Sequence, residues 1–428
     1  MKFSRRSMLS ALGLAVASAG PAKAAAKLTY NKDLRRLLEK AIQAGGAFDL
    51  PAGRHEISGL MITSPLRLSG VPGQTILVSR DGRPVLTIDG ASNVSLHGVT
   101  FESADSPPTD DFALVTAAGA TGLLIESCGF AESPGSGLRL EGCSGRVTGN
   151  RFSGIAKTAL FARDSKGLEI SGNSLTGIGN NGIQVWTSEP REDGTIVSNN
   201  RIAHVAARDG GTGQNGNGIN IYKAGNVSVS ANRVSDCAFS AIRNNGGSNC
   251  QIVNNAISRT GEVAIYCEFG FEGAVVSGNL LEDVALGISI TNFNEGGRLA
   301  VVANNVIRKV TGGGSLPATN GVGIGAEADT VVTGNVIEDA ADTGLSLGWG
   351  QYARNLSATG NLLRNCRRGI VFSAADGADR VLIANNRIAG SRDGAILGGD
   401  HGSVVTGDLG LDGAEIPGGS QIAGNLVS

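Results

Sequence analysis

The sequence contains few aromatic residues, and its charges almost cancel. Among 428 residues there are 2 Trp, 4 Tyr and 12 Phe, so we do not expect several compact cores of the usual kind. The 36 basic and 38 acidic residues leave a formal charge of −2. No basic run interleaved with aromatic residues occurs, which argues against a nucleic-acid partner. No stretch after the N-terminus reaches the ~18 apolar residues of a membrane span, so we expect no membrane span in the mature chain. We also expect the protein to be a monomer.

The first residues have the pattern of an export signal. Arg5 and Arg6 precede a short apolar stretch from Leu9 to Ala19, and a small-residue cleavage pattern follows at residues 22–24. The pattern predicts a twin-arginine signal peptide over residues 1–26, which is cleaved to leave the mature protein in the periplasm. An ordinary secretory signal with two chance arginines is the alternative, and it also takes the chain out of the cytoplasm.

Six cysteines in an oxidising compartment are enough for three disulfides. Only Cys128 with Cys143, and Cys237 with Cys250, lie close together in the sequence. Cys267 falls at an inward position of a predicted strand, and other cysteines recur at turns of the repeat described below. We therefore predict buried free thiols that pack as small hydrophobic residues.

Residues 31–46 carry the helical signal of the chain. Leu34, Leu37, Leu38, Ala41 and Ile42 recur at helical spacing behind an N-cap residue at position 31. The helix is expected to stop at the glycine pair 45–46 and to lead into the Leu-Pro-Ala-Gly segment at residues 50–53. Such a helix is suited to cover the open end of a solenoid core.

An asparagine recurs through the rest of the chain, followed after one residue by an aliphatic residue or Phe. The ten copies are Asn150, Asn173, Asn200, Asn232, Asn255, Asn279, Asn305, Asn335, Asn361 and Asn386. A period of ~20–50 residues is typical of stacked supersecondary units. Asn suits the turn because it tolerates the left-handed backbone and its amide can bond to the Asn above and below. Longer copies are expected to carry loops after Asn200 and Asn305.

Each copy also contains short segments that alternate apolar with polar residues, as at residues 218–222 and 287–291. Alternation of period two indicates strands. Coils of two or three short strands, with no helical pattern between them, stack in parallel on the next coil. The sequence therefore predicts an all-β fold, a single right-handed parallel β-helix over residues 47–400 with an N-terminal capping helix, followed by a C-terminal rung or tail over 401–428.

The cap helix, the Leu50-Pro51-Ala52-Gly53 entry and the Asn repeats resemble the pectin-lyase-like superfamily of right-handed β-helices. They resemble more closely an uncharacterised family of twin-arginine-translocated repeat proteins. The resemblance spans residues 31 to about 400. It implies a polysaccharide or oligosaccharide ligand, and it carries no mechanism of its own.

The strand register predicts two outward columns on one wall of the solenoid. Counting from the Gly or Ala that opens each strand, the first and third residues point inward and the second and fourth point outward. Rungs ~4.8 Å apart match the repeat of an extended sugar chain. The predicted substrate-binding residues on this wall are Gln184, Trp186, Asn220, Tyr222 and Asn245. Scarce aromatic residues gathered on one wall favour sugar binding.

Elimination or C5-epimerisation of a uronate needs a cation to neutralise the carboxylate and a base to remove the C5 proton. The residues that we expect to fill these roles are Lys223, Arg243, Tyr266 and Glu268. The hypothesis is therefore a lyase or epimerase acting on an acidic polysaccharide. Its alternative is a non-catalytic protein that binds glycan or a partner along the same wall.

Glycoside hydrolysis is the second enzymatic alternative. It normally needs two carboxylates ~5–9.5 Å apart, and the nearest column neighbour of Glu268 is Glu327, two rungs or ~10 Å away. Glu268 with Asn245 is also a candidate Ca²⁺ site, because carboxylate and amide oxygens are ligands for hard cations. The four histidines are scattered over unrelated rungs and are expected on the surface or in turns, with no metal spacing.

Overall fold

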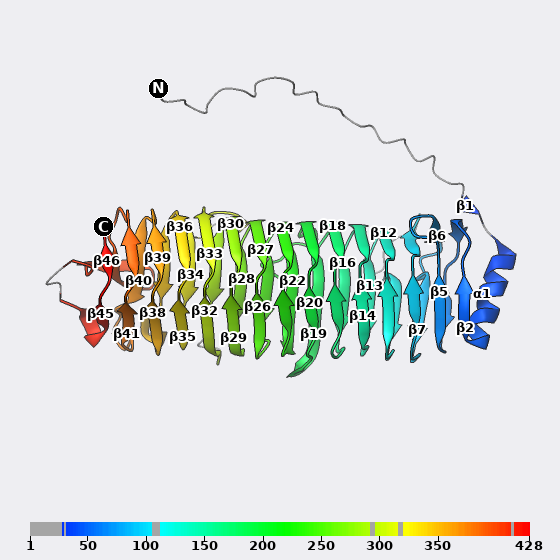
Figure 1. The fold of residues 1–428 in the computed structure, drawn as a ribbon, viewed down its shortest axis with the longest axis horizontal. Helices are drawn as coiled ribbons and strands as arrows, with labels where there is room; N and C mark the ends of the chain where they lie inside the picture. Colours follow the sequence, from blue (N-terminus) through cyan, green and yellow to red (C-terminus); the bar gives the residue numbers. More distant parts are fainter. Residues whose placement is uncertain (1–27, 30, 105–111, 292–295, 316–319, 412–414) are drawn as a thin grey trace, which may run out of the picture.

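The computed structural model describes residues 28–29, 31–104, 112–291, 296–315, 320–411 and 415–428. Within them the chain winds into an elongated parallel β-helix (Figure 1). Three sheets of 16, 15 and 15 strands run along its length. Sheet A begins with β1 (Leu28–Thr29), β3 (Gly53–Glu56) and β6 (Thr75–Ser79). Sheet B begins with β2 (Gly46–Asp49), β5 (Leu66–Ser69) and β8 (Ser95–His97), and sheet C with β4 (Leu60–Ile62), β7 (Leu86–Asp89) and β10 (Ala113–Ala118). Every third strand then continues each sheet until its last strand. The predicted fold class is confirmed. The predicted signal peptide lies outside the described residues.

A single α-helix covers the N-terminal end of the solenoid. Helix α1 (Lys32–Ala44) is capped by Asn31, whose Oδ1 accepts a hydrogen bond from the Leu34 nitrogen at 2.9 Å. Leu34, Leu38 and Ile42 are buried against the first coil, whereas Leu37 is 50% exposed. The apolar face of the helix is therefore narrower than its leucine spacing predicted. Among the described helices, none is long and apolar enough to cross a membrane.

Sheet C contains the wall that the sequence analysis singled out. Its central strands are β13 (Ser136–Glu141), β16 (Thr158–Arg163), β19 (Asn181–Glu192), β22 (Asn217–Gly225), β25 (Ile242–Asn245), β28 (Val263–Glu268), β31 (Leu286–Ile290) and β34 (Val322–Ala326). The predicted inward positions are buried, including Ile183, Val185, Ile219, Ile221 and Ile265. Alternation between core and solvent places the intervening residues outward.

A ladder of asparagines closes the turn between sheets B and A. From Asn173 onward, each Asn accepts hydrogen bonds at Oδ1 from the backbone nitrogen and Nδ2 of the Asn one coil earlier, as Asn255 does from Asn232 at 3.0 Å and 3.0 Å. Its own Nδ2 donates to a backbone carbonyl, which for Asn255 is that of Val229. All ten predicted asparagines are buried and Asn425 extends the ladder. Buried backbone groups of this turn are thereby satisfied from Cys128 to Asn425.

The sequence pattern predicted that the ladder asparagine itself has the left-handed backbone conformation, and this prediction was wrong. The preceding residue has the positive φ, as at Asn199 (57°), Ala231 (56°) and Asn254 (57°). Gly149 and Gly172 take the same place in earlier coils. The ladder Asn is therefore selected for its buried amide, and the backbone conformation is taken by its neighbour.

All six cysteines are free and buried, as predicted. Burial raises the pKa of the Cys128 thiol to about 11 and that of Cys237 to about 12. Five of the sulfurs, all but that of Cys267, also lie near a carbonyl oxygen. Cys128 begins the Asn ladder by donating its backbone N–H to Asn150 Oδ1 at 2.9 Å. Protonated, buried thiols react slowly, and these serve as packing residues.

At the C-terminal end, the parallel pattern of sheet C changes. Strand β43 (Ile396–Asp400) pairs antiparallel with β44 (Ser403–Asp408), and β45 (Gln421–Ala423) and β46 (Leu426–Val427) add the last rung of sheets B and A. Pairing the last strand with a hairpin leaves fewer free backbone groups at this edge.

Replacement of a ladder asparagine tests the turn. We expect Asn255→Ala to lower the free energy of unfolding by about 2–4 kcal/mol, because the buried N–H groups of Asn232 lose their acceptor. Denaturant titration measures the change. Gln251→Ala, at an exposed position of the same coil, is the control and is expected to change stability by under ~0.5 kcal/mol. Equal stability of the two variants would show that the ladder does not stabilise the fold.

Candidate functional site

The two outward columns of sheet C form a continuous wall. In the first column, the residues in register in successive rungs are Arg139, Phe161, Gln184, Asn220, Arg243, Tyr266 and Ser289. In the second column the order is Glu141, Arg163, Trp186, Tyr222, Asn245 and Glu268. The register is the one that the sequence predicted, so the expected binding residues lie on one face.

Three aromatic rings follow one another across adjacent rungs of this wall. The Phe161 and Trp186 rings meet edge to face with centroids 5.3 Å apart, and the Trp186 and Tyr222 rings are tilted with centroids 5.0 Å apart. The Arg139 guanidinium lies 5.5 Å from the Phe161 centroid. All three rings are partly exposed. The result is a semi-rigid apolar platform about three rungs long, which we call the aromatic run.

The polar residues beside the aromatic run are more buried than expected. Gln184 is 6% and Asn220 5% exposed, and Gln184 Oε1 accepts a hydrogen bond from the Thr158 hydroxyl at 3.0 Å. Asn220 Oδ1 and Trp186 Nε1 are buried and make no hydrogen bond among the residues described. Buried polar atoms without partners are uncommon and call for an explanation.

Arg243 stands between two glutamates. Its Nε donates to Glu268 Oε1 at 2.6 Å, and its Nη1 lies 3.4 Å from Glu262 Oε2. Asn245 Nδ2 also donates to Glu268 Oε1 at 3.0 Å, and the Ser240 hydroxyl donates to Glu262 Oε2 at 2.7 Å. One guanidinium thus bridges two carboxylates, an arrangement that we call the Arg243 cluster.

The prediction that Arg243 and Glu268 are exposed residues of an open wall was wrong. Arg243 is 9% exposed and Glu268 is 2% exposed. For Arg243 the reason is the loop 206–216 between β21 (Arg201–Val205) and β22, which the long spacing after Asn200 had indicated. The Gly213 carbonyl of this loop accepts a hydrogen bond from Arg243 Nη1 at 3.0 Å. The loop therefore covers the guanidinium from outside the sheet.

The same loop is fastened to the starts of the wall strands. Asp209 Oδ2 accepts hydrogen bonds from Lys157 Nζ at 2.8 Å and Asn180 Nδ2 at 2.7 Å. These two donors hold the pKa of Asp209 below its usual value. A Cβ at Gly213, whose φ is +125°, would lie 1.9 Å from Arg243 Nη1. Glycine is thus required where the loop meets the cluster.

Burial changes the proton affinity of the groups around Arg243. Desolvation raises the pKa of Glu262, although the Ser240 hydroxyl and Arg243 act in the opposite direction. Desolvation, with the nearby Glu268 charge, raises the pKa of Tyr266 to about 12. Tyr266 therefore stays protonated at neutral pH, and its ring packs 5.0 Å from the Arg243 guanidinium carbon. Glu262 and Glu268 both contact Arg243, but the second donor is the Ser240 hydroxyl for Glu262 and the Asn245 amide for Glu268.

Lys223 does not join the other predicted catalytic residues. Arg243 pairs with Asn220, three residues before Lys223, which places the lysine ~10 Å farther along the strand direction. Its amine lies 5.2 Å from the Tyr222 ring and 3.5 Å from the Ser188 carbonyl. Ser188 belongs to the part of β19 that projects from the solenoid (Figure 1). Arg243, Tyr266 and Glu268 are together, and Lys223 lies at the other margin of the wall.

The geometry does not favour calcium at Glu268 and Asn245. Asn245 turns its nitrogen, not its oxygen, toward Glu268 Oε1, and the Arg243 cation lies against the same oxygen. Across the described chain, no three His, Cys, Asp or Glu side chains cluster as metal ligands. His55, expected at the surface or in a turn, is instead 7% exposed in β3 (Gly53–Glu56).

Sequence reasoning missed Glu262. It lies in the turn before β28, one residue ahead of the alternating segment that was used to assign columns. Glu262 and Arg243 lie in neighbouring coils, so the contact between them depends on how tightly the turn before β28 closes. The signal in the sequence was an acidic residue just before an apolar strand. The period of the repeat does not show whether a residue in such a turn is buried.

A family model described as the right-handed β-helix region matches residues 85–211, 136–307 and 190–347, together more than half of the chain. The chain belongs to the right-handed β-helix family. Residues 299–416 of this β-helix also match a model described as the periplasmic copper-binding protein NosD. No curated protein matches the sequence.

Solved structures share the fold at low sequence identity. A PL6 alginate lyase in complex with a trisaccharide is 14% identical, with a TM-score of 0.53 over 91% of this chain and 88% of that chain. The tailspike of E. coli bacteriophage HK620, a mutant in complex with a pentasaccharide, is 12% identical, with a TM-score of 0.51 over 86% of this chain and 75% of that one. At these identities the likeness concerns the fold alone.

Removal of Arg243 tests the cluster. We expect Arg243→Ala to destabilise the β-helix by about 3–5 kcal/mol, because it leaves two buried carboxylates without their cation and releases Gly213. The melting temperature measures this, and limited proteolysis should cut loop 206–216 faster. Arg163→Ala, on the same wall with a 42% exposed side chain, is the control. Identical melting of the Arg243 variant and wild type would restore the exposed-wall interpretation.

Proposed function

We propose that this β-helix is an exported protein that binds a polysaccharide chain along the wall of sheet C. The observation that carries the proposal is the aromatic run, Phe161, Trp186 and Tyr222, on three successive rungs. Aromatic faces pack against sugar rings, and a rung spacing of ~4.8 Å allows successive sugar units to meet successive side chains. The export pattern at the N-terminus and the match to a periplasmic protein model support the periplasm as the compartment.

The margins of the wall support a lengthwise binding mode. Loop 206–216 borders the start of the wall strands, and the projecting end of β19, with Lys223 beside it, borders the other side. Asn220 Oδ1 and Trp186 Nε1, for which the described part of the chain supplies no partner, are an acceptor and a donor for sugar hydroxyls once a ligand shifts these side chains. The bound saccharides of the alginate lyase and the tailspike are consistent with this use of the fold.

Titration with oligosaccharides of neutral sugars and of uronates tests the binding proposal. We expect Trp186→Ala and Tyr222→Ala each to weaken binding at least ~5-fold, as for aromatic anchors in other interfaces. Trp349→Ala is the matched control, because this tryptophan is 47% exposed and contacts His401, far along the solenoid. If folded wild-type protein binds neither class of oligosaccharide, or both wall variants bind as wild type does, the proposal is wrong.

The Arg243 cluster bears on which chemistry accompanies binding. Lyase or epimerase chemistry on a uronate needs positive charge for the substrate carboxylate, but Arg243 already pairs with Glu262 and Glu268. Lys223 is the remaining cation of the predicted set, and it lies apart from Tyr266. Elimination at this site would thus have to draw its cation and its base from opposite margins of the wall.

Glycoside hydrolysis is the second candidate function, favoured by the two carboxylates on one guanidinium. Their bonded oxygens are separated at most by one guanidinium and two hydrogen bonds, within the ~9.5 Å upper limit for catalytic carboxyl pairs. Glu262, whose pKa is raised by burial, is the candidate acid, and Glu268 the candidate base or nucleophile. Both are buried, so a substrate reaches them only after loop 206–216 moves.

Release of reducing ends from a bound polymer tests hydrolysis. We expect Glu262→Gln and Glu268→Gln each to lower the rate ~10²–10⁴-fold. The wild-type rate should fall as the pH rises through the raised pKa of Glu262, because the acid must hold its proton. Glu282→Gln, on sheet A, is the control. A polymer that binds the wall and yields no new ends at any pH would leave a non-catalytic binding protein.

A further inference from the structure

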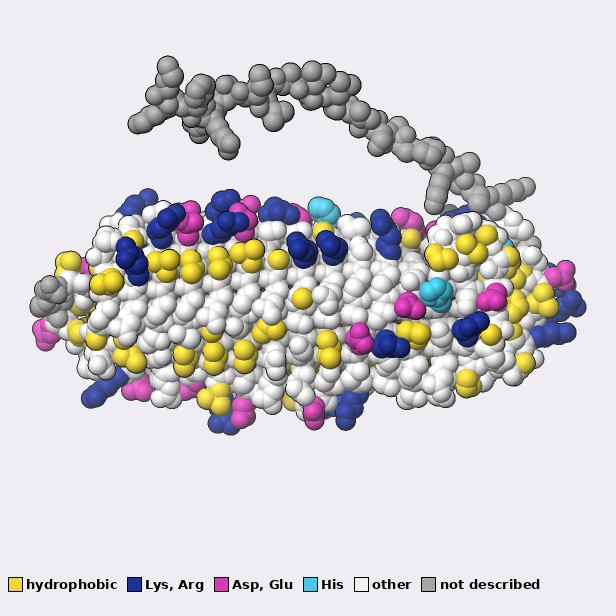
Figure 2. Space-filling view, viewed as in Figure 1, with side chains coloured by type: hydrophobic (Ala, Val, Ile, Leu, Met, Phe, Trp, Pro, Cys, Tyr) yellow, Lys and Arg dark blue, Asp and Glu magenta, His cyan; other side chains and the backbone are white. Residues whose placement is uncertain are grey.

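Two rows of exposed aliphatic side chains run along the C-terminal half of the solenoid, on the corner between sheets A and B (Figure 2). On sheet B the row consists of Val275 in β29 (Glu272–Ser277), Val301 in β32 (Arg298–Ala303) and Val331 in β35 (Thr330–Thr333), each 39–42% exposed. On sheet A it consists of Leu280, Val306 and Val336 in β30 (Leu280–Val284), β33 (Val306–Val310) and β36 (Val336–Ala340), each 37–44% exposed. We call the two rows the aliphatic strip.

The six residues of the strip follow one another without interruption in three successive coils. At the register position of Leu280 and Val306, earlier coils of sheet A carry Arg201 and Arg233. At the position of Val275, earlier coils of sheet B carry polar or charged residues except for the single exposed Ile196; in chain order they are Arg146, Glu169, Ile196, Ser228 and Gln251. The coil geometry is the same in both halves, so the fold itself does not require aliphatic residues here. Figure 2 shows the two rows side by side with a band of other residues between them, and exposed apolar side chains gathered in this way mark an interaction site.

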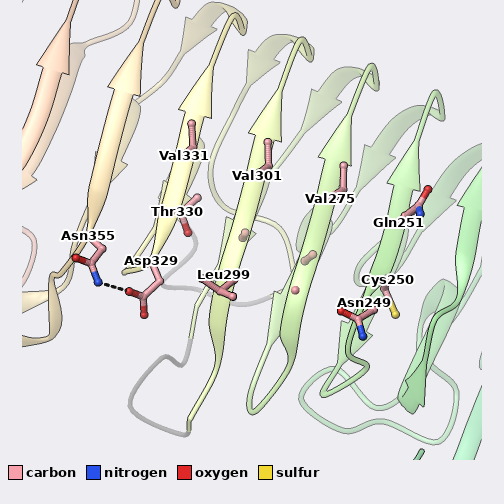
Figure 3. A pocket seen from close by; sticks show the side chains of 13 residues that line it. Asn249, Cys250, Gln251, Val275, Leu299, Val301, Asp329, Thr330, Val331 and Asn355 are labelled. Carbon is pink, nitrogen blue, oxygen red and sulfur yellow. Dashed lines mark hydrogen bonds between the residues drawn. The ribbon is translucent and has the colours of Figure 1, made fainter. Parts of the chain in front are cut away.

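Beside the valine row lies a shallow groove of about 660 Å³ (Figure 3). Its lining includes the three valines and Leu299, with Asn249 and Asp329 at its margin. Asp329 is already engaged, because it accepts a hydrogen bond from Asn355 Nδ2 at 2.7 Å and pairs with Arg354 at 2.8 Å. The groove therefore offers apolar surface rather than an open charge.

Leu299 is the unusual residue of this groove. The positions in register with it are Asn249, Gly273, Asp329 and Asn355, and all of them have positive φ. Leu299 shares this conformation, with φ 64°, and it is 55% exposed. Glycine, Asn and Asp take the left-handed region at low cost, whereas a bulky apolar residue there is a true outlier. An exposed leucine at a strained position indicates a contact made outside this chain.

We propose that the aliphatic strip and its groove are the interface of a dimer between two copies of this chain. Leu299 projects next to the groove, so a two-fold rotation brings the leucine of each copy into the groove of the other. The valine rows repeat at ~4.8 Å in both copies and can therefore interdigitate. The neighbouring charges are paired within the chain, as Arg308 and Lys309 are with Glu282, so the surface favours an uncharged partner surface such as its own.

The size of the strip sets the expected strength of the dimer. The groove spans five rungs, from Asn249 to Asn355, so a length of ~24 Å and roughly 20 Å of width give ~500 Å² per copy, or about 1,000 Å² in all, which is the lower limit for a specific interface. We therefore expect a dimer that dissociates in the micromolar range, in contrast to the monomer expected from the sequence. The wall of sheet C lies on another face, so the proposal is independent of glycan binding.

Sedimentation equilibrium of the mature protein over about 1–200 µM tests the proposal, and we expect a monomer–dimer equilibrium there. Leu299→Asn and Val301→Lys should each weaken the dimer at least ~10-fold. Asn suits the left-handed position, so the first variant should melt no lower than wild type, which separates loss of contact from loss of folding. Met61→Gln, at a 56% exposed position of β4 (Leu60–Ile62), is the matched control.

Three results would overturn the dimer. The wild-type chain would remain monomeric over the whole concentration range, or both interface variants would dimerise as wild type does. The third is a monomer whose groove binds a fluorescent fatty acid that Leu299→Asn no longer binds, which would assign the strip to an acyl chain. A dimer that depends on Leu299 and Val301 but not on Met61 is the result that supports the proposal.

Discussion

Every coil of this protein depends on its neighbours for the hydrogen bonds of its backbone. A strand of three to six residues cannot satisfy its own N–H and C=O groups, so the parallel stacking of coils is the constraint behind the whole structure. The asparagine ladder applies the same rule to the turn between sheets B and A, where each amide bonds to the next coil. The cap helix and the antiparallel hairpin at β43 and β44 occupy the two ends where stacking stops.

Stacking also decides what the outer surface can do. Any residue at one outward position is brought within ~5 Å of its counterparts in the coils before and after it. Sheet C uses this to gather the aromatic run, although the whole chain has only 2 Trp and 4 Tyr. Sheets A and B use it in the C-terminal half to gather aliphatic residues. One fold thereby presents regularly spaced aromatic side chains on one face and the aliphatic strip on another.

The Arg243 cluster shows how a loop changes a position that the strand pattern marks as outward. Arg243 does point away from the core, but loop 206–216 contacts its guanidinium through Gly213, and Glu262 reaches it from a turn. Their charges are then held in a poorly hydrated place, where pairing matters far more than on an open surface. The contact of Gly213 with Arg243 therefore affects both the stability of the fold and any chemistry on the wall.

Much of the architecture was readable from the sequence, because period-two alternation and a 23–32-residue repeat are local patterns. They determined the β-helix, the two wall columns, the buried isoleucines and the free cysteines. Which residue of the Asn turn is left-handed was misassigned, since the amide bond and the backbone conformation belong to neighbouring residues. Only the tertiary structure decided the burial of Arg243, its pairing with Glu262, the separation of Lys223 and the outlying conformation of Leu299. Each of these depends on how a loop or turn closes over the next coil, and the repeat carries no information about that closure.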